Sequence, residues 1–331
     1  MTPPFRHEAE VDGVAQIRVA VIGAGRAGLA ASHALLKKGF RPGDDFIVVD
    51  AAEPQHTAWK TRWHSMTFHE PARRFALPDD PMPGDPHRRP RTDEMADYLD
   101  WYRAKIGVHP RWNTTVQKIA TEADGRTLSI TTSAGTIRAG SIVAATGPYA
   151  IPETPAFAIR TVVPGINIHS GSYTHPRAVP PGSVLIVGGG ASGREIAHEL
   201  AHSHEVILST SATHKRRWLA VAPETELPLE LLRAHGVATV GRITGGSATG
   251  LHTVDGGTLT PQSVIWATGY HHGFDYLPAR ALGAAGEVLS RRGRTPVPGV
   301  FVLGIDHRKA AGPARVVRDA ARIAHLIGKR Q

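Results

Sequence analysis

Two glycine-rich loops of the same pattern constrain the fold of this chain more than any other feature. The first loop, residues 23–28 (G-A-G-R-A-G), follows a short apolar run at 17–22. The second loop, residues 188–193 (G-G-G-A-S-G), follows a similar run at 183–187. A helical pattern comes directly after each loop. A buried strand, such a loop and a helix in this order are typical of a dinucleotide-binding fold.

The same order of elements occurs twice along the chain. Each loop is followed later by a strand that ends in Ala-Thr-Gly, at 145–147 and at 267–269. The loops begin 188 − 23 = 165 residues apart, which indicates an internal repeat. We therefore expect an α/β fold with two Rossmann-like dinucleotide-binding domains, the second inserted in the first. The alternating pattern at 127–142 adds a β-meander.

The repeat predicts where the domains lie. Residues 17–160 and 273–331 should form the first dinucleotide-binding domain, and residues 161–272 the second. The polar segment 1–16 has no clear periodicity, so we expect a disordered tail there.

The residues of the first loop have separate roles. Gly23 allows the tight turn, Gly25 lets a pyrophosphate approach the backbone, and Gly28 lets the helix pack on the strand. The backbone at Arg26 and Ala27 begins the helix and presents free N–H groups and the positive dipole end to phosphates. Asp50 ends the next strand, 50 − 28 = 22 residues past the last glycine, where a carboxylate accepts hydrogen bonds from ribose hydroxyls. We assign this loop to FAD.

The second loop has the same context but a different strand end. The next strand ends in Ser209 and Thr210 without an acid, and the basic residues Lys215 and Arg216 follow. A carboxylate there would repel a ribose 2′-phosphate, whereas hydroxyls and cations bind it. The sequence therefore favours NADPH over NADH. The loop positions expected to hold this cofactor are Gly188, Gly190, Ala191, Ser192 and Gly193.

Other strand ends supply further candidate contacts. Gly147 closes the first Ala-Thr-Gly strand, and Thr268 with Gly269 closes the second. Gly304 and Asp306 end a later strand. Because ligands bind at the carboxyl ends of parallel strands, we expect all of these residues to contact cofactor, and Asp306 to hold the ribityl or pyrophosphate region of the flavin.

The composition excludes several kinds of chemistry. The chain has no cysteine, so it has no thiol nucleophile, thiolate metal site or redox-active cysteine pair. Any redox chemistry must therefore belong to a bound cofactor. Among the 19 histidines, His198 and His202 stand four apart on a predicted helix, a spacing that zinc sites use. No third ligand is obvious in the sequence, so we expect no metal.

The charge and hydropathy patterns bear on partners and location. The net charge of +9 is scattered and comes without a nucleic-acid-binding motif, so we expect a solvated basic surface and no nucleic-acid partner. No apolar run approaches the roughly 20 residues that span a bilayer. The N-terminus has no secretory signal pattern. We expect a cytoplasmic protein with no membrane partner.

The sequence resembles the class B flavoprotein monooxygenases, which comprise the flavin-containing and Baeyer–Villiger monooxygenases. The family fingerprint F-x-G-x-x-x-H-x-x-x-[Y/F/W] is matched at 163–173 by Gly165, His169 and Tyr173, with Val163 in place of the first aromatic residue. The resemblance extends from about residue 17 to residue 327.

The resemblance also covers the aromatic patch that follows the first acid. Trp59 and Trp63 match it and imply contacts near the flavin. Family members carry Gly-Gly before the first tryptophan, where this chain has His56, Thr57 and Ala58. His69 aligns with the family asparagine that supports the oxygenated flavin, so the resemblance implies that role for His69.

The resemblance implies a reaction in two steps. NADPH gives a hydride to FAD, and the reduced flavin then reacts with O2 to give a C4a-hydroperoxyflavin that oxygenates a small nucleophilic substrate. We expect His69, His169 and Tyr173 to act in catalysis, with His169 as a hinge and NADPH contact rather than an acid or base. The modest length favours N- or S-oxygenation over ketone insertion. A dimer is plausible.

Two alternatives stay open at this stage. One is an NAD(P)H-dependent flavin reductase that passes electrons to a quinone or a protein, because the same fold serves both functions. The other is a non-catalytic flavin or NADP sensor, which the departure at His56 and Thr57 keeps open.

Overall fold

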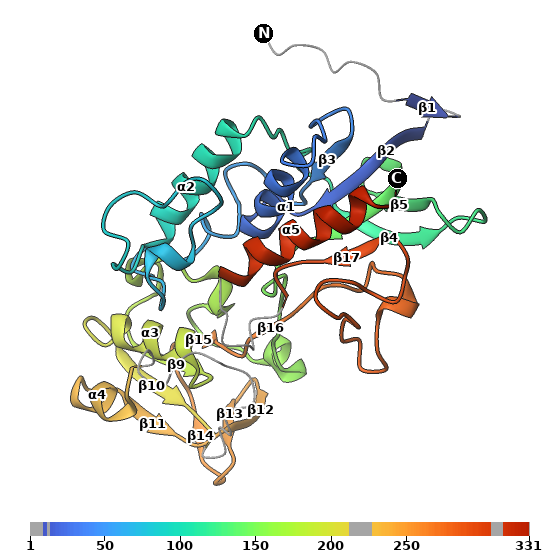
Figure 1. Ribbon diagram of the computed structural model, residues 1–331. Helices are drawn as coiled ribbons and strands as arrows, with labels where there is room; N and C mark the ends of the chain where they lie inside the picture. Colours follow the sequence, from blue (N-terminus) through green and yellow to red (C-terminus); the bar gives the residue numbers. More distant parts are fainter. Residues whose placement is uncertain (1–8, 12–13, 212–226, 306–313, 331) are drawn as a thin grey trace. The chain divides into compact units, whose positions relative to one another are not determined.

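The computed structural model describes residues 9–11, 14–211, 227–305 and 314–330 (Figure 1). The chain divides into two compact units. The first comprises 1–60, 70–150 and 272–331, and the second comprises 61–69 and 151–271. The first unit is therefore interrupted twice, once by a short segment and once by a long one.

The first unit is built around parallel strands. The central strand β2 (Val14–Ile22) lies between β3 (Phe46–Val49) and β6 (Gly135–Ala144), and β17 (Val300–Val302) pairs with the far side of β6, all in parallel. Ile22 is in register with Val49 on one side and with Ala144 on the other. The carboxyl ends of β2, β3 and β6 therefore meet at one edge, as in dinucleotide-binding sheets.

Helices and an antiparallel meander complete this unit. The meander continues the same sheet from β6 to β5 (Leu128–Thr132) and β4 (Val116–Thr121). Strand β1 (Ala9–Val11) pairs antiparallel with β2. The helices are α1 (Arg26–Leu36), which directly follows the first glycine loop, α2 (Thr92–Lys105) and α5 (Ala314–Gly328), which packs against α1 (Figure 1).

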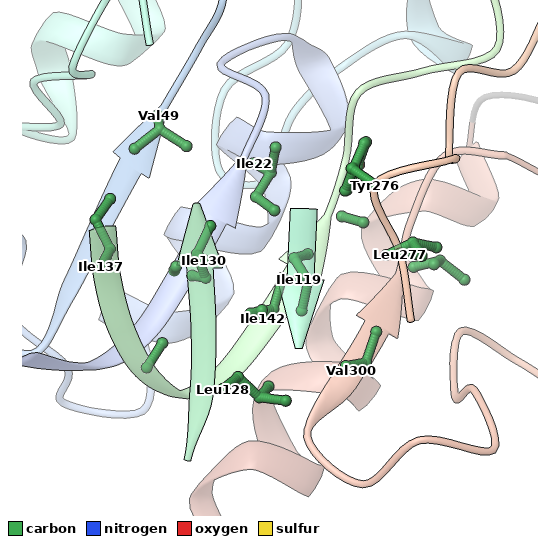
Figure 2. Packing of buried hydrophobic residues seen from close by; sticks show 14 of the residues in the cluster. Ile22, Val49, Ile119, Leu128, Ile130, Ile137, Ile142, Tyr276, Leu277 and Val300 are labelled. Carbon is green, nitrogen blue, oxygen red and sulfur yellow. The ribbon is translucent and has the colours of Figure 1, made fainter. Parts of the chain in front are cut away.

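The core of the first unit joins the meander to the parallel strands. Leu128 and Ile130 stand two apart on β5, so both point to the same face of the sheet, where they meet Ile22 and Ile142 (Figure 2). Tyr276 and other residues that precede β17 close the same cluster. Burial of this one apolar face fixes the register of the strands that carry the first glycine loop.

The second unit contains a sheet in which every strand is parallel. Its order is β11 (Ala238–Val240), β10 (Glu205–Ser209), β9 (Ser183–Val187), β15 (Ser263–Trp266) and β8 (Asn167–His169). The helices are α3 (Ala191–Leu200), directly after the second glycine loop, and α4 (Leu229–Ala234). Smaller sheets are formed by β12 (Ile243–Ser247), β13 (Gly250–Thr253) and β14 (Thr258–Leu259), and by β7 (Ile151–Pro152) with β16 (Tyr270–His271).

Several predicted boundaries need correction. Strand β2 begins at Val14 and β1 occupies Ala9–Val11, so part of the tail expected at 1–16 is strand. The N-cap of α2 is Arg91, whose N–H donates a hydrogen bond to the Glu94 carboxylate at 2.8 Å. The segment 61–69 belongs to the second unit, where the His64 N–H donates to the Thr174 carbonyl at 3.0 Å.

Candidate functional site: two dinucleotide cradles

The backbone of the first loop leaves one face open. Gly23 has a φ of +104°, and a Cβ there would lie 2.6 Å from the Ala145 carbonyl oxygen. A Cβ on Gly28 would lie 1.8 Å from the Gly23 oxygen, so both positions require glycine. A Cβ on Gly25 would meet no atom within 4 Å. Gly23 and Gly28 thus shape the loop, and Gly25 leaves a space beside the backbone that a pyrophosphate fits.

The start of α1 is uncapped and points at this space. Gly25 is the N-cap without a side-chain hydrogen bond, and the first turn contains no acid. The free N–H groups and the helix dipole favour an anion there. The Arg26 side chain does not join them, because its Nε donates to the Phe75 carbonyl at 2.7 Å. Burial lowers the pKa of Arg26 to about 10. Only the backbone of Arg26 is therefore available to an anion at this loop.

Asp50 ties the loop to the end of β3. One carboxylate oxygen accepts from the Ala24 N–H at 2.6 Å, and the other accepts from the Ala52 N–H at 2.8 Å. Asp50 is half-buried at the tip of the strand. These contacts hold the carboxylate beside the loop, where its remaining lone pairs can accept from a ribose.

Two of the other predicted contacts of the first unit lie around this loop. Gly304 follows β17, and a Cβ there would lie 2.9 Å from the Ala27 Cβ. Gly147 has a φ of +78° and open space around its Cα. It follows Ala145 and Thr146, which contact Gly23. Trp59 is half-buried in the same unit, and Asp306 lies outside the described residues.

The second loop repeats the geometry of the first. Gly188 has a φ of +119°, and a Cβ there would lie 2.3 Å from the Ala267 oxygen. A Cβ on Gly193 would lie 1.9 Å from the Gly188 oxygen, whereas one on Gly190 would meet nothing within 4 Å. Gly190 is the uncapped N-cap of α3, which begins with Ala191 and Ser192 and has no acid in its first turn. A second dinucleotide therefore fits here as the first fits at Gly25.

The strand tip beside the second loop differs from our prediction. Ser209 is 2% exposed, and its hydroxyl donates to the Gly241 carbonyl at 2.9 Å. The hydroxyl that we expected at the cofactor phosphate is therefore turned toward the backbone of Gly241, and its contact with the phosphate stays a prediction. Thr210 packs on the loop, since a Cβ on Gly189 would lie 2.8 Å from the Thr210 Cβ. Lys215 and Arg216 lie outside the described residues.

Sequence reasoning did not single out Arg242, an exposed cation among the described residues that follow β11. The Thr210 N–H donates to the Val240 carbonyl at 3.0 Å, and the Ser209 hydroxyl holds the next residue, Gly241. Arg242 therefore follows directly on a turn fixed beside Thr210. It is exposed, and within the described part of the chain its side chain makes no hydrogen bond or ion pair. The signal in the sequence was a cation that closely follows the β-branched run at 239–240.

His169 of the fingerprint holds backbone in place. Its Nε2 lies 3.0 Å from the Gly269 carbonyl oxygen and acts as the donor, because its Nδ1 accepts from the Gly171 N–H at 3.0 Å. Burial lowers the pKa of His169, so the imidazole stays neutral. Its ring meets the edge of Tyr270 at 4.8 Å between centroids. Tyr270 also accepts from Arg62 Nη1 at 2.7 Å.

Tyr173 and Trp63 lie in the core of the second unit. Tyr173 is 1% exposed and its hydroxyl donates to Glu199 at 2.6 Å. Burial and this carboxylate raise its pKa. Trp63 is 3% exposed and packs on Tyr173 at 6.5 Å between ring centroids. Both side chains are thus core residues of the second unit. The catalytic role expected for Tyr173 and the flavin contact expected for Trp63 stay predictions.

The remaining candidates of the second unit are partly exposed. His69 Nε2 lies 3.0 Å from a carboxylate oxygen of Glu195 on α3, so His69 belongs to the surroundings of the second loop. The Thr268 hydroxyl donates to the Glu153 carbonyl, and the Gly269 carbonyl accepts from the Glu153 N–H at 2.9 Å. These contacts fix the end of the second Ala-Thr-Gly strand beside β7.

A third histidine joins His198 of α3 and His202, which lies two residues past the end of that helix. His235 lies 5.0 Å from His198 and 6.3 Å from His202 between ring centroids, a neighbour that the sequence did not reveal. The Nδ1 atoms of His202 and His235 lie at hydrogen-bond distance from the backbone carbonyls of His198 and Leu231. Across the described residues, no group of three or more His, Cys, Asp or Glu side chains is arranged to hold a metal ion.

Comparisons with known proteins agree with this geometry. Residues 20–304 match the family model described as pyridine nucleotide-disulphide oxidoreductase. An uncharacterized CzcO-like oxidoreductase from Geobacillus kaustophilus is 28% identical, over 94% of this chain and 97% of its own length. The solved flavin-containing monooxygenase from Stenotrophomonas maltophilia is 27% identical with a TM-score of 0.78, over 95% of this chain and 99% of its own. An indole-3-pyruvate monooxygenase from Oryza sativa subsp. japonica is 30% identical over 54% of this chain and 44% of its own.

These matches confirm the predicted two-Rossmann α/β fold and the resemblance to flavoprotein monooxygenases. They also confirm the class of enzyme, which is an oxidoreductase of the flavin monooxygenase type. FAD and NADPH are the cofactors of that family. Within the described residues, no helix has the length and apolar character needed to cross a membrane.

Proposed function

Because the chain belongs to the pyridine nucleotide-disulphide oxidoreductase family, we propose that it is an NADPH-dependent flavin monooxygenase that oxygenates a nitrogen or sulfur atom of a small molecule. In the overall reaction NADPH supplies two electrons and O2 supplies two oxygen atoms. One oxygen atom enters the substrate and the other leaves as water. FAD, when bound, supplies the redox chemistry that joins NADPH to O2.

The absence of cysteine is the observation that carries this proposal. The description of the family names a disulphide as well as a pyridine nucleotide, yet this chain contains no cysteine. A redox-active cysteine pair therefore cannot relay electrons from the flavin to a substrate. The electrons must pass directly from the flavin to an acceptor, and the likeness to the Stenotrophomonas maltophilia monooxygenase favours O2 as that acceptor.

The residues of each loop then have defined tasks. At the first loop, the backbone around Gly25 binds the pyrophosphate of FAD and Asp50 accepts from its ribose. At the second, the backbone around Gly190 binds the pyrophosphate of NADPH, and Thr210 with Arg242 binds its 2′-phosphate. His169 stays neutral and holds the Gly269 carbonyl, which positions the strand end beside the nicotinamide cofactor.

Oxygen labelling tests the proposal directly. The purified protein is supplied with FAD, NADPH and isotopically heavy O2, together with a panel of tertiary amines and thioethers. We expect NADPH consumption to match the formation of a product that carries one heavy oxygen atom. Recovery of all electrons as hydrogen peroxide across the panel, or reduction of a quinone faster than O2, would instead establish the flavin reductase. A colourless protein that FAD does not reconstitute would contradict both.

A further inference from the structure

A cavity of about 280 Å³ opens in the first unit, between the start of β17 and the C-terminal end of α5. It belongs to neither glycine loop. A proline-rich turn and the first residues of β17 line it, together with one residue of α5 and two residues just past its end, namely Arg294 to Phe301 with Leu326, Lys329 and Arg330.

The wall of this cavity is apolar and firmly built. Val297, Val300 and Phe301 are all buried. The hydroxyl of Thr295 donates to the Val300 carbonyl at 2.8 Å and holds the turn closed. Prolines at 296 and 298 fix φ on both sides of Val297. The cavity therefore exists before any ligand arrives, which lowers the entropy lost on binding.

The polar part of the lining has one sign of charge. Arg294, Lys329 and Arg330 line the cavity, and no carboxylate of the described residues does. Within the described residues, none of these three side chains makes a hydrogen bond or an ion pair. A Cβ on Gly299 would lie 3.3 Å from Arg330 Nη2, which places this guanidinium directly over the turn. The carbonyl end of α5 offsets only about half of one charge.

The position of the cavity separates it from the flavin. It lies at the amino end of β17, whereas Gly304, beyond the carboxyl end of the same strand, packs on Ala27 of the first loop. The four steps along the chain from Val300 to Gly304 span at most about 13 Å. The cavity is thus a second site at the opposite edge of the sheet.

We propose that this cavity binds a small amphiphilic anion, a carboxylate or sulfonate joined to a compact apolar body. The three cations would hold the anionic group, and Val297, Phe301 and Leu326 would cover the apolar body. The volume equals about nine water molecules at roughly 30 Å³ each, which suits a short aliphatic or single-ring acid. This site is independent of the proposed function, so either can fail without the other.

Equilibrium dialysis of the FAD-loaded protein with labelled octanoate tests the site. Two matched probes separate its parts, since octanamide has the same body without charge and inorganic phosphate has charge without the body. We expect octanoate to bind with a dissociation constant on the order of 0.1–1 mM, and both other probes to bind at least about tenfold more weakly.

A matched set of variants locates the binding. The double variant Arg294→Gln with Arg330→Gln should weaken octanoate about tenfold or more. Arg318→Gln should leave it unchanged, because Arg318 is an exposed cation on α5 outside the cavity lining whose side chain makes no hydrogen bond or ion pair in the described part of the chain. Flavin absorbance and thermal unfolding verify that each variant is folded. Absence of octanoate binding, equal binding of octanamide, or equal octanoate binding by the double variant would each overturn the proposal.

Discussion

The two glycine loops have the same backbone and different neighbours. In each, the first glycine lies against an Ala-Thr-Gly strand end, and the last glycine lies against the first. The glycine at the third position of the loop, Gly25 or Gly190, faces open space. Beside the first loop stands Asp50, whose carboxylate accepts from the Ala24 N–H. Beside the second stands Thr210, with Arg242 on the adjacent turn.

The residues that shape each glycine loop therefore differ from the residues that select its cofactor. Close contacts between backbone atoms dictate glycine at the first and last positions, so the loop shape is independent of the ligand. The next strand tip decides the ligand, because a carboxylate suits ribose hydroxyls and a guanidinium suits a phosphate. A change at the loop should therefore remove a cofactor, and a change at the tip should alter preference between cofactors.

The largest expected effects come from filling the two open faces. Gly25→Val and Gly190→Val place side chains in empty space at residues with negative φ, so both proteins should fold. We expect Gly25→Val to lose bound FAD. We expect Gly190→Val to keep FAD while NADPH reduces it at least about 100-fold more slowly, since the pyrophosphate has lost its place.

Flavin absorbance and stopped-flow reduction measure these outcomes. Dithionite, which needs no nucleotide site, should still reduce the flavin of Gly190→Val at the normal rate. If Gly25→Val keeps FAD and Gly190→Val loses it, our assignment of the two loops is reversed.

The next largest effect concerns preference at the second strand tip. We expect Arg242→Gln to raise the KM for NADPH roughly 10–100-fold, the worth of one charged hydrogen bond to phosphate, and to leave the KM for NADH unchanged. Arg233→Gln is the matched control, because the Arg233 guanidinium is already bonded to Thr239 on β11, the strand that precedes Arg242. An equal rise for both nucleotides would show that Arg242 does not read the 2′-phosphate.

The comparison also shows what the sequence could and could not predict. The loops, their strands and the inserted domain follow from local patterns, because glycine positions and apolar runs are contiguous in the chain. Pairings between distant segments do not follow. Trp63 packs on Tyr173 and Ser209 turns toward Gly241 because of the three-dimensional arrangement. Residues that matched a family pattern thus proved to be core, and Arg242, outside every motif, was missed.

A smaller effect should appear in the pH dependence of the second unit. Burial, together with His235 and His202, lowers the pKa of His198 below its usual value of 6.5, and burial lowers that of His169. Unfolded histidines then bind protons more readily than folded ones. Stability is therefore fully present above pH about 6.5 and falls as the pH drops below it. Thermal unfolding between pH about 7.5 and 5.5 should show this fall, and His198→Gln should reduce it. If the unfolding temperature of His198→Gln falls with pH as steeply as that of the wild type, His198 does not contribute to the pH dependence.

The smallest effect should come from the fingerprint tyrosine. Tyr173→Phe removes one hydrogen bond to Glu199, which is half-buried and can be reached by water, so we expect a loss of about 0.5–1.5 kcal/mol in the free energy of unfolding. Because the Tyr173 ring is buried among core residues, the kcat with NADPH should stay within about twofold of the wild-type value. Thermal unfolding and steady-state kinetics on the same preparation measure both. A large fall in kcat with unchanged stability would show that Tyr173 takes part in the reaction. The fingerprint of the second unit would then contribute to catalysis as well as to packing.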